Sequence, residues 1–253
     1  MEIQRIQMFG ERHSSTKYLA SQLRRYFKIP VVTTFGHKHF FTIEKILKQQ
    51  HLLDTTFFIA IVRNPYSWLS GMYNLPYHCN IFNKKDKNIF LTSEWESKND
   101  AGKIIHEDNH IFNKQKYKNI FELRSTKNIF LKYSMPKLVP YYKFIKYEYF
   151  LQSNYLQFLI HNIANQYNLS LKDSLRESRR LEVFTKGSRP IDTFYSKEIL
   201  SLVNQNMDWC IENDIGYYPI YNIQQSNTDI SQINKADYLL HRFSAPSGKR
   251  KRA

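Results

Sequence analysis

The sequence is poor in cysteine and has no long apolar run, and each absence excludes a class of protein. Its two cysteines, Cys79 and Cys210, lie far apart, so a disulfide framework and a cysteine metal site are not expected. No apolar stretch approaches the roughly 20 residues that cross a bilayer. The chain begins without the basic and apolar regions of a signal peptide. We therefore expect a cytoplasmic protein with reduced thiols and no transmembrane segment.

Acidic residues are also scarce. The chain has 22 acidic and 37 basic residues, which gives a formal net charge of +15. Such a charge attracts nucleic acid, polyanionic sugars and phosphorylated cofactors, but it does not choose among them. Part of it lies in the basic run 249–252, which ends a segment rich in Asn, Gln and Ser. We interpret residues 223–253 as a basic, disordered tail that could bind nucleic acid weakly or direct the protein to the nucleus.

The hydrophobic pattern predicts one α/β domain over residues 1–222. The run 55–62 is typical of a strand buried on both faces of a parallel sheet. Strand-like and helix-like segments alternate along the chain, so we expect a three-layer α/β sandwich with a central, mainly parallel sheet. Residues 74–116 are predicted to form an irregular insertion near the active face, in the position of a lid. The predicted strands are 2–9, 31–34, 55–62 and 141–147, and the predicted helices are 14–27, 43–50, 66–73, 117–130, 151–167 and 196–213.

The turn after the first predicted strand has the chemistry of an anion site. The first N–H groups of a helix have no intrahelical acceptor, and the helix dipole adds partial positive charge. Hydroxyl and cationic side chains strengthen such a cradle for phosphate or sulfate. The Gly-Lys-Ser/Thr of a Walker A loop is absent, and a serine cap on an ordinary helix would give a similar pattern. The residues of this turn are Gly10, Glu11, Arg12, His13, Ser14, Ser15, Thr16 and Lys17.

A second turn with unusual chemistry follows the strand at 55–62. It begins Arg63-Asn64-Pro65 and continues into a predicted helix that carries Ser67 and Ser70. Ligands of parallel sheets bind at the carboxyl ends of the strands, so both turns should open on the same edge of the sheet. An arginine there can bind phosphate through charge-assisted hydrogen bonds, although a strand-end arginine can also serve only in an ion pair.

Together, the two turns resemble the ligand motifs of the sulfotransferase family. Residues 10–19 look like its 5′-phosphosulfate loop, in the variant that begins Gly-Glu-Arg and continues Ser-Gly-Thr. Residues 61–73 resemble its 3′-phosphate motif, and weaker similarity extends over about residues 3–218. The resemblance implies a P-loop-NTPase-like sulfotransferase fold. It also implies the donor 3′-phosphoadenosine 5′-phosphosulfate (PAPS), the product 3′,5′-bisphosphoadenosine, and no metal.

The resemblance also implies roles for single residues of both motifs. Arg63 would bind the adenosine 3′-phosphate, and Ser70 or Ser67 would be the helix serine of that motif. Gly71 stands at the place where the family has this serine.

In the first motif, the catalytic lysine of the family aligns with His13. The positive charge would therefore come from Arg12, His13 or Lys17. The family usually has glycine, which allows close backbone approach, where this chain has Ser15.

The segment 36–40, after the second predicted strand, supplies the candidate base. Sulfuryl transfer needs a cation on the departing phosphate oxygen and a base near the acceptor hydroxyl. Sulfotransferases often carry a Lys-His or Lys-x-His sequence here, so the resemblance favours His39 as the base and Lys38 as a second cation. A histidine near its ordinary pKa suits this role, and His37 or Glu11 are the alternatives.

The expected function is therefore transfer of a sulfuryl group from PAPS to a hydroxyl acceptor. A carbohydrate acceptor is favoured by the relatives that share the Gly-Glu-Arg loop. It is also favoured by the aromatic residues, 15% of the chain, which could stack on sugar rings. Two alternatives stay open: a catalytically inactive binder of nucleotide, glycan or nucleic acid, and a P-loop nucleotide kinase.

Overall fold

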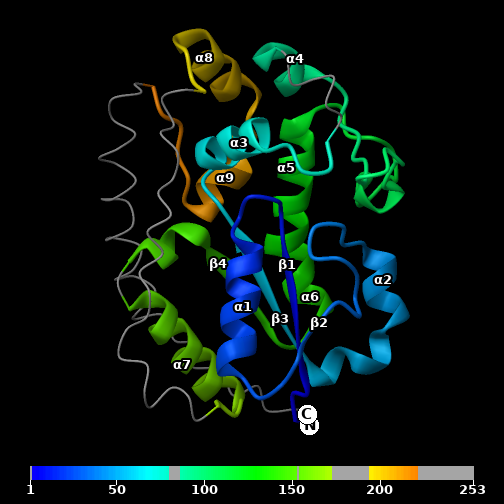
Figure 1. The fold of residues 1–253 in the computed structure, drawn as a ribbon, viewed down its shortest axis with the longest axis vertical. Coiled ribbons are helices and arrows are strands. Elements are labelled where there is room, and N and C mark those ends of the chain that lie inside the picture. Colours follow the sequence, from blue (N-terminus) through cyan, green and yellow to red (C-terminus); the bar gives the residue numbers. More distant parts are fainter. Residues whose placement is uncertain (1, 80–85, 153, 173–193, 222–253) are drawn as a thin grey trace. The chain divides into compact units, whose positions relative to one another are not determined.

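Four strands form one parallel sheet, in the spatial order β2-β1-β3-β4 (Figure 1). The computed structural model describes residues 2–79, 86–152, 154–172 and 194–221. The carboxyl ends of the strands meet at one edge, because every strand pair is parallel. The prediction of an α/β fold with a parallel sheet is confirmed. The strands are β1 (Arg5–Gly10), β2 (Val31–Val32), β3 (Thr56–Val62) and β4 (Tyr142–Lys146).

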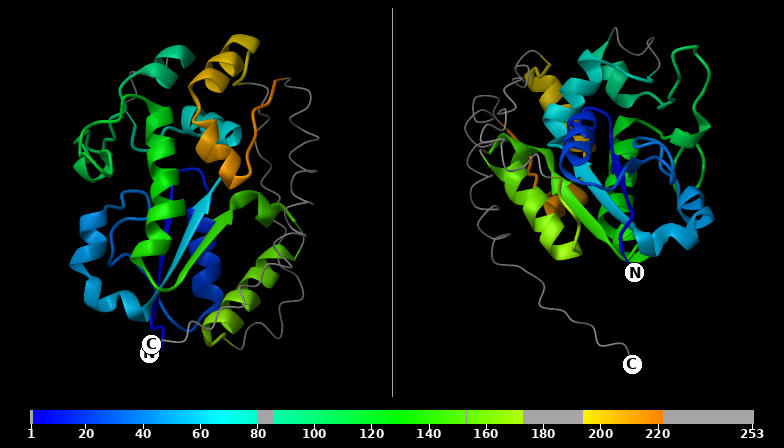
Figure 2. Two further views of the ribbon diagram at one scale, coloured as in Figure 1. Left: turned by 180° about the vertical axis from the view of Figure 1, so that it is seen from behind. Right: turned by 60° about the horizontal axis from the view of Figure 1, so that its bottom comes forward.

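The inner strands of the sheet are buried on both faces because their residues are apolar at consecutive positions. All seven residues of β3 are buried, and in β1 only Arg5 is partly exposed. Helix α1 (Thr16–Tyr26) covers one face and helix α5 (Ile120–Ile129) the other, as views from opposite sides show (Figure 2). Such coverage is typical of parallel sheets.

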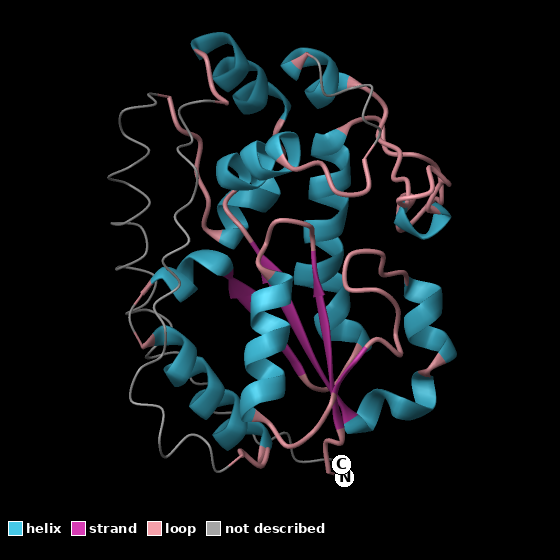
Figure 3. Ribbon diagram, in the orientation of Figure 1, coloured by secondary structure: helices cyan, strands magenta, loops and turns pink. Residues whose placement is uncertain are grey.

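The other helices surround this sheet (Figure 3). Three of them begin where the side chains of Asn64, Asn119 and Asp208 accept hydrogen bonds from first-turn N–H groups. The α-helices are α2 (Ile43–Lys48), α3 (Pro65–Asn74), α4 (Lys87–Thr92), α6 (Met135–Leu138), α7 (Tyr155–Tyr167), α8 (Lys197–Asn206) and α9 (Trp209–Ile215). The shorter turns are η1 (Gln50–Thr55), η3 (His106–Asp108), η4 (Phe130–Ser134, a π-helix) and η5 (Tyr147–Leu151).

The prediction of one helix over 196–213 is wrong, because the segment forms two helices. Met207 has extended backbone between α8 and α9, with φ −70° and ψ 137°. Asp208 then caps α9 by accepting a hydrogen bond from the N–H of Ile211. This carboxylate satisfies an amide that a continuous helix would have bonded internally, so a new helix starts here. Cys210 is exposed, whereas Ile211 is buried.

The described part of residues 74–116 is mostly irregular, as predicted, but it contains α4 and η3. The sheet and its helices belong to one compact unit, Met1–Pro219. A second unit, Ile220–Ala253, is described only at its first two residues, so the predicted basic tail lies outside the described residues. No helix in the described ranges has both the length and the apolar character needed to cross a membrane.

Gly10 is the last residue of β1 and the first of the turn 10–17, which we call the first anion turn. It allows β1 to approach β3 closely at this point. It pairs with Ile61 across the sheet. A Cβ atom added to Gly10 would lie 2.6 Å from the carbonyl oxygen of Ile61 and 2.7 Å from its Cγ2 atom. These contacts are too short for a real side chain, so only glycine fits without a shift of β3.

The substitution Gly10→Ala should therefore destabilise the fold by about 1–3 kcal/mol, the usual cost of overpacking a tight site. Urea unfolding would show this as a lower midpoint. Gly102→Asn is the control, because nothing lies within 4 Å of a Cβ atom at Gly102 and asparagine tolerates its φ of +76°. Equal midpoints for the two variants would contradict the packing explanation.

Candidate functional site

A cavity of about 360 Å³ opens beside the turns that follow β1, β2 and β3. It brings together the first anion turn, the segment 36–40 and Arg63, as the prediction of a common sheet edge requires. The lining residues are Arg12, His13, Ser15, Thr16, Lys17, His37, Lys38, His39, Arg63, Tyr77 and His78. The other candidates, which do not line it, are Gly10, Glu11, Ser14, Ser67 and Ser70.

The cavity is positively charged, and the described residues that line it include no carboxylate. Lys17, Lys38 and Arg63 form no ion pair with any residue that the structure describes. Burial lowers the pKa of Lys38, and the neighbouring charges of Lys17 and Arg24 lower it further. Cations that repel one another in a concave site are relieved by an anion, so this cavity attracts one.

The N-terminus of α1 adds free donors to the same cavity. Ser15 is its N-cap residue, but the side chain of Ser15 makes no capping hydrogen bond. Within the described chain, the backbone N–H groups of Ser15, Thr16 and Lys17 have no acceptor. In contrast, the side chain of Asn64 caps α3. The first turn of α1 therefore has amides and a helix dipole available to a phosphate or sulfate.

The ring of His13, in the turn after β1, packs on Gly71 of α3. A Cβ atom added to Gly71 would lie 3.0 Å from the His13 ring. Nε2 of His13 donates to the carbonyl of Leu75 at 2.7 Å, because a carbonyl can only accept. Burial lowers the pKa of His13 to about 4, so at neutral pH the positive charge of the cavity comes from other residues.

Ser15 occupies a backbone conformation that glycine adopts more readily than other residues. Its φ of 60° and ψ of 28° are left-handed, a region that side chains disfavour and glycine enters freely. His13 has a φ of 60° as well. The first anion turn therefore holds two non-glycine residues in left-handed conformations, which is a strain typical of functional sites.

Arg63 connects the second turn to the first. Its Nη1 donates to the backbone carbonyl of His13 at 2.9 Å. Its guanidinium carbon lies 4.6 Å from the ring centre of Tyr147. The Nε atom of Arg63 is buried without a hydrogen-bond partner in the described structure. A buried donor without an acceptor is costly, so the site fits a ligand that supplies an oxygen there.

Two buried charged side chains, Arg124 and Glu148, fix the backbone around Arg63. Arg124 donates to the carbonyl of Arg63 at 2.8 Å and pairs with Glu212 at 2.7 Å. Glu148 accepts from the N–H of Asn64 at 2.7 Å. Arg124 is thus a structural ion-pair partner.

His39 has the geometry of a general base. Its Nδ1 lies 2.6 Å from the carbonyl oxygen of Gly10. A carbonyl can only accept, so Nδ1 carries a proton and the neutral ring keeps its lone pair on Nε2. Burial lowers the pKa of His39, and the charge of Arg12 lowers it further. The ring is therefore uncharged at neutral pH, but its pKa lies well below the ordinary value that was expected of a base.

The two candidate serines of α3 do not reach the cavity. Ser70 is buried, and its Oγ accepts a hydrogen bond from Asn74 at 3.2 Å. The N–H of Ser67 is bonded to the side chain of Asn64 at 3.3 Å. The later basic turn, residues 186–189, lies outside the described residues.

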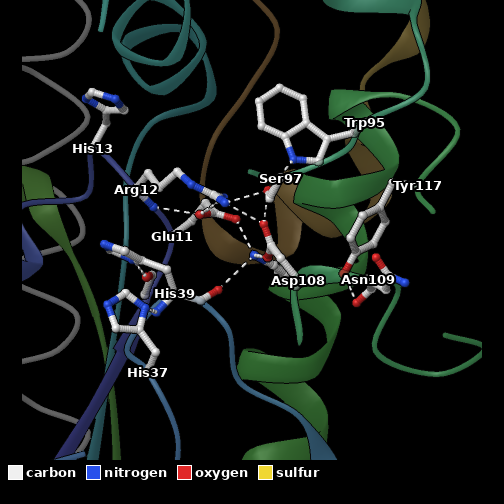
Figure 4. A network of polar contacts seen from close by, with 12 residues as sticks. Glu11, Arg12, His13, His37, His39, Trp95, Ser97, Asp108, Asn109 and Tyr117 are labelled. Carbon is white, nitrogen blue, oxygen red and sulfur yellow. Dashed lines mark hydrogen bonds and ion pairs between the residues drawn. The ribbon is translucent and has the colours of Figure 1, made fainter. Parts of the chain in front are cut away.

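Glu11 and Arg12 point into a buried cluster of charges (Figure 4). Glu11 pairs with Arg12 at 2.8 Å and with Lys127 at 2.6 Å. Asp108 also pairs with both Arg12 and Lys127. Ser97 accepts from Arg12 at 2.7 Å and donates to Asp108. Two carboxylates thus balance two cations out of contact with water.

This cluster changes what two predicted site residues can do. Burial by itself would raise the pKa of Glu11, but Lys127 and Arg12 lower it to about 2, so Glu11 remains ionised. Asp108 and Glu11 similarly raise the pKa of Arg12 against the effect of burial. Arg12 borders the cavity, but Glu11 and Asp108 compensate its charge, whereas Lys17 and Arg63 have no ion-pair partner among the residues that the structure describes.

The sequence did not point to Asp108 or Ser97. Both lie in the irregular insertion, where no periodicity or motif distinguishes them. Lys127 follows the segment 121–125 that resembles the family, but nothing local indicated a contact with Glu11, which is 116 residues away. Only the folded chain shows that the insertion is bonded to the first anion turn.

Comparison of the chain with protein-family models, with curated proteins and with solved structures found no match. Within the described residues, no group of three or more His, Cys, Asp or Glu side chains is placed to hold a metal ion.

The lowered pKa values of His13 and His39 predict that acid destabilises the fold. Below the ordinary histidine pKa of 6.5, the histidines of the unfolded chain become protonated. In the folded chain both rings have a lower pKa, which is about 4 for His13, so they stay neutral over this range. Stability should thus decrease as pH falls from about 6.5 towards 4, by at most about 1.4 kcal/mol per pH unit and histidine.

Urea unfolding at several pH values measures this dependence. His13→Gln should weaken it, because one of the three described rings with a lowered pKa (His13, His37 and His39) no longer titrates. His161→Gln, a change at an exposed site on α7, is the control and should leave it unchanged. A stability that stays constant or rises between pH 6.5 and 5 would contradict the assignment.

Proposed function

We propose that the chain is a sulfotransferase that transfers a sulfuryl group from PAPS to a hydroxyl acceptor. One observation carries this proposal. Three cations that have no ion-pair partner among the described residues, and the N-terminus of α1, where Ser15 makes no capping side-chain hydrogen bond, face a cavity that has no carboxylate among its described lining residues. This combination fits a ligand with several anionic oxygens. It also agrees with the order and spacing of the two motifs in the sequence.

Two parts of the cavity would hold the two anionic ends of the donor. The first-turn amides of α1, with Lys17 and Lys38, would bind the phosphosulfate. Arg63, whose Nε has no acceptor within the described structure, would bind the 3′-phosphate. Bound there, the donor supplies an activated sulfuryl group. The lysines would stabilise the negative charge that develops on the departing phosphate oxygen.

His39 would act as the base on the acceptor. The bond from Nδ1 to the Gly10 carbonyl orients the ring and leaves Nε2 free to take the proton of the hydroxyl. Tyr77, which lines the same cavity and is 58% exposed, offers an aromatic face to the acceptor. Such a face suits a sugar ring, so a carbohydrate remains the favoured acceptor.

The alternative of a nucleotide kinase is less compatible with this site. Kinases and related enzymes bind their nucleotide with Mg²⁺, which is held by carboxylate oxygens. The described lining of the cavity has no carboxylate, and those of Glu11 and Asp108 are engaged by Arg12 and Lys127.

Donor binding is tested by calorimetry with 3′,5′-bisphosphoadenosine and with ATP. We expect the bisphosphate to bind more tightly than ATP. Arg63→Ala should weaken it about 10- to 100-fold, the loss of a charge-assisted hydrogen bond of about 1.5–3 kcal/mol. Lys48→Ala, at an exposed position of α2, should have no effect. Unchanged affinity in Arg63→Ala, or equal affinity for ATP, would refute the donor site.

Catalysis is tested separately with His39→Gln. Release of 3′,5′-bisphosphoadenosine from PAPS is followed in the presence of a panel of glycans. Loss of the base should lower the transfer rate about 10²- to 10⁴-fold and affect donor affinity much less. A wild-type protein that binds the bisphosphate but sulfates no hydroxyl compound would support the non-catalytic alternative instead.

A further inference from the structure

Lys127 lies at the junction of three separate segments of the chain. Its Nζ donates to Glu11 in the first anion turn at 2.6 Å and to the backbone carbonyl of His39 at 2.9 Å. It also pairs with Asp108 of the insertion. The ammonium group has three protons, so these three acceptors use all of them. The side chain of Lys127 is only 2% exposed, which excludes water as a competing acceptor.

These bonds act on the same peptide segment that carries the candidate base. The backbone carbonyl of His39 accepts a hydrogen bond from Lys127. Nδ1 of the His39 ring donates to the carbonyl of Gly10 at 2.6 Å. The N–H of Gly10 in turn donates to the carbonyl of Lys38 at 2.9 Å. The backbone and the ring of His39 are thus both tied to residues 10 and 11 of the anion turn.

Asp108 is the part of this arrangement that the insertion contributes. Asp108 accepts hydrogen bonds from Lys127 and from Arg12 (Figure 4). Ser97 donates to Asp108 and accepts a hydrogen bond from Trp95 at 3.1 Å. Asp108 therefore keeps Lys127 between Glu11 and the His39 carbonyl. Without Asp108, the ammonium group of Lys127 would lose its acceptor in the insertion, residues 74–116.

We propose that Asp108 and Lys127 are positioning residues, which fix His39 in its Nδ1–H form against the anion turn. The proposal rests on the proposed function only in giving His39 the role of base. Neither residue lines the cavity, so their effect on a reaction would act through His39. A displacement of about 1 Å in a reacting group can cost about 100-fold in rate.

The test uses NMR of the full chain labelled with ¹⁵N-histidine, which distinguishes the two neutral forms of the ring. Wild-type His39, assigned with His39→Gln, should show the Nδ1–H form. The charge-balanced double variant Asp108→Asn/Lys127→Met should show a mixture of both forms with a rapidly exchanging ring proton. Lys132→Met is the control, because it removes an ion pair with Asp214 one turn beyond Lys127 and should leave His39 unchanged.

A folded double variant whose His39 keeps the wild-type signal would overturn the proposal. If the double variant does not fold, Lys127→Arg retains the charge but cannot place one nitrogen among the three acceptors, and the same criterion applies. The wild-type spectrum is itself decisive, since an Nε2–H form of His39 would also refute the proposal. None of these readouts needs a nucleotide, so a failure to bind 3′,5′-bisphosphoadenosine would refute the proposed function separately.

Discussion

The buried pairing of Glu11 and Asp108 with Arg12 and Lys127 is the interaction on which the site depends. Removing four charges from water is costly, and the cost is offset only when each charge meets an opposite one with good geometry. Each carboxylate here contacts both cations, and each cation contacts both carboxylates. Any large movement of the anion turn or of the insertion would leave buried charges without partners, so both are fixed where they lie.

This cluster also separates two kinds of cation that the sequence places side by side. Arg12 is neutralised within the cluster and serves the fold, whereas Lys17, Lys38 and Arg63 have no ionic partner within the described chain. Part of the positive charge of the protein therefore lies at the cavity without an ionic partner among the described residues, which the formal net charge of +15 does not reveal. A site without nearby carboxylates keeps its attraction for an anion.

Packing and backbone conformation decide which residues the turn after β1 accepts. The ring of His13 occupies the space that a side chain at Gly71 would need. Ser15 takes a left-handed backbone conformation, which glycine enters more freely than other residues. The first-turn amides of α1, which have no acceptor within the described chain, border the cavity.

Local patterns were sufficient for the four strands and for the helices α1 and α5 that cover the sheet, because alternation and helical spacing act over a few positions. They also showed that both turns lie at one edge, since parallel strands end together. They failed where contacts are distant: Asp108 meets Arg12 across 96 residues, and Ser70 turns to Asn74 instead of the cavity. Which cations are neutralised and which remain available is a property of long-range ion pairs, and only the packing of the chain decides it.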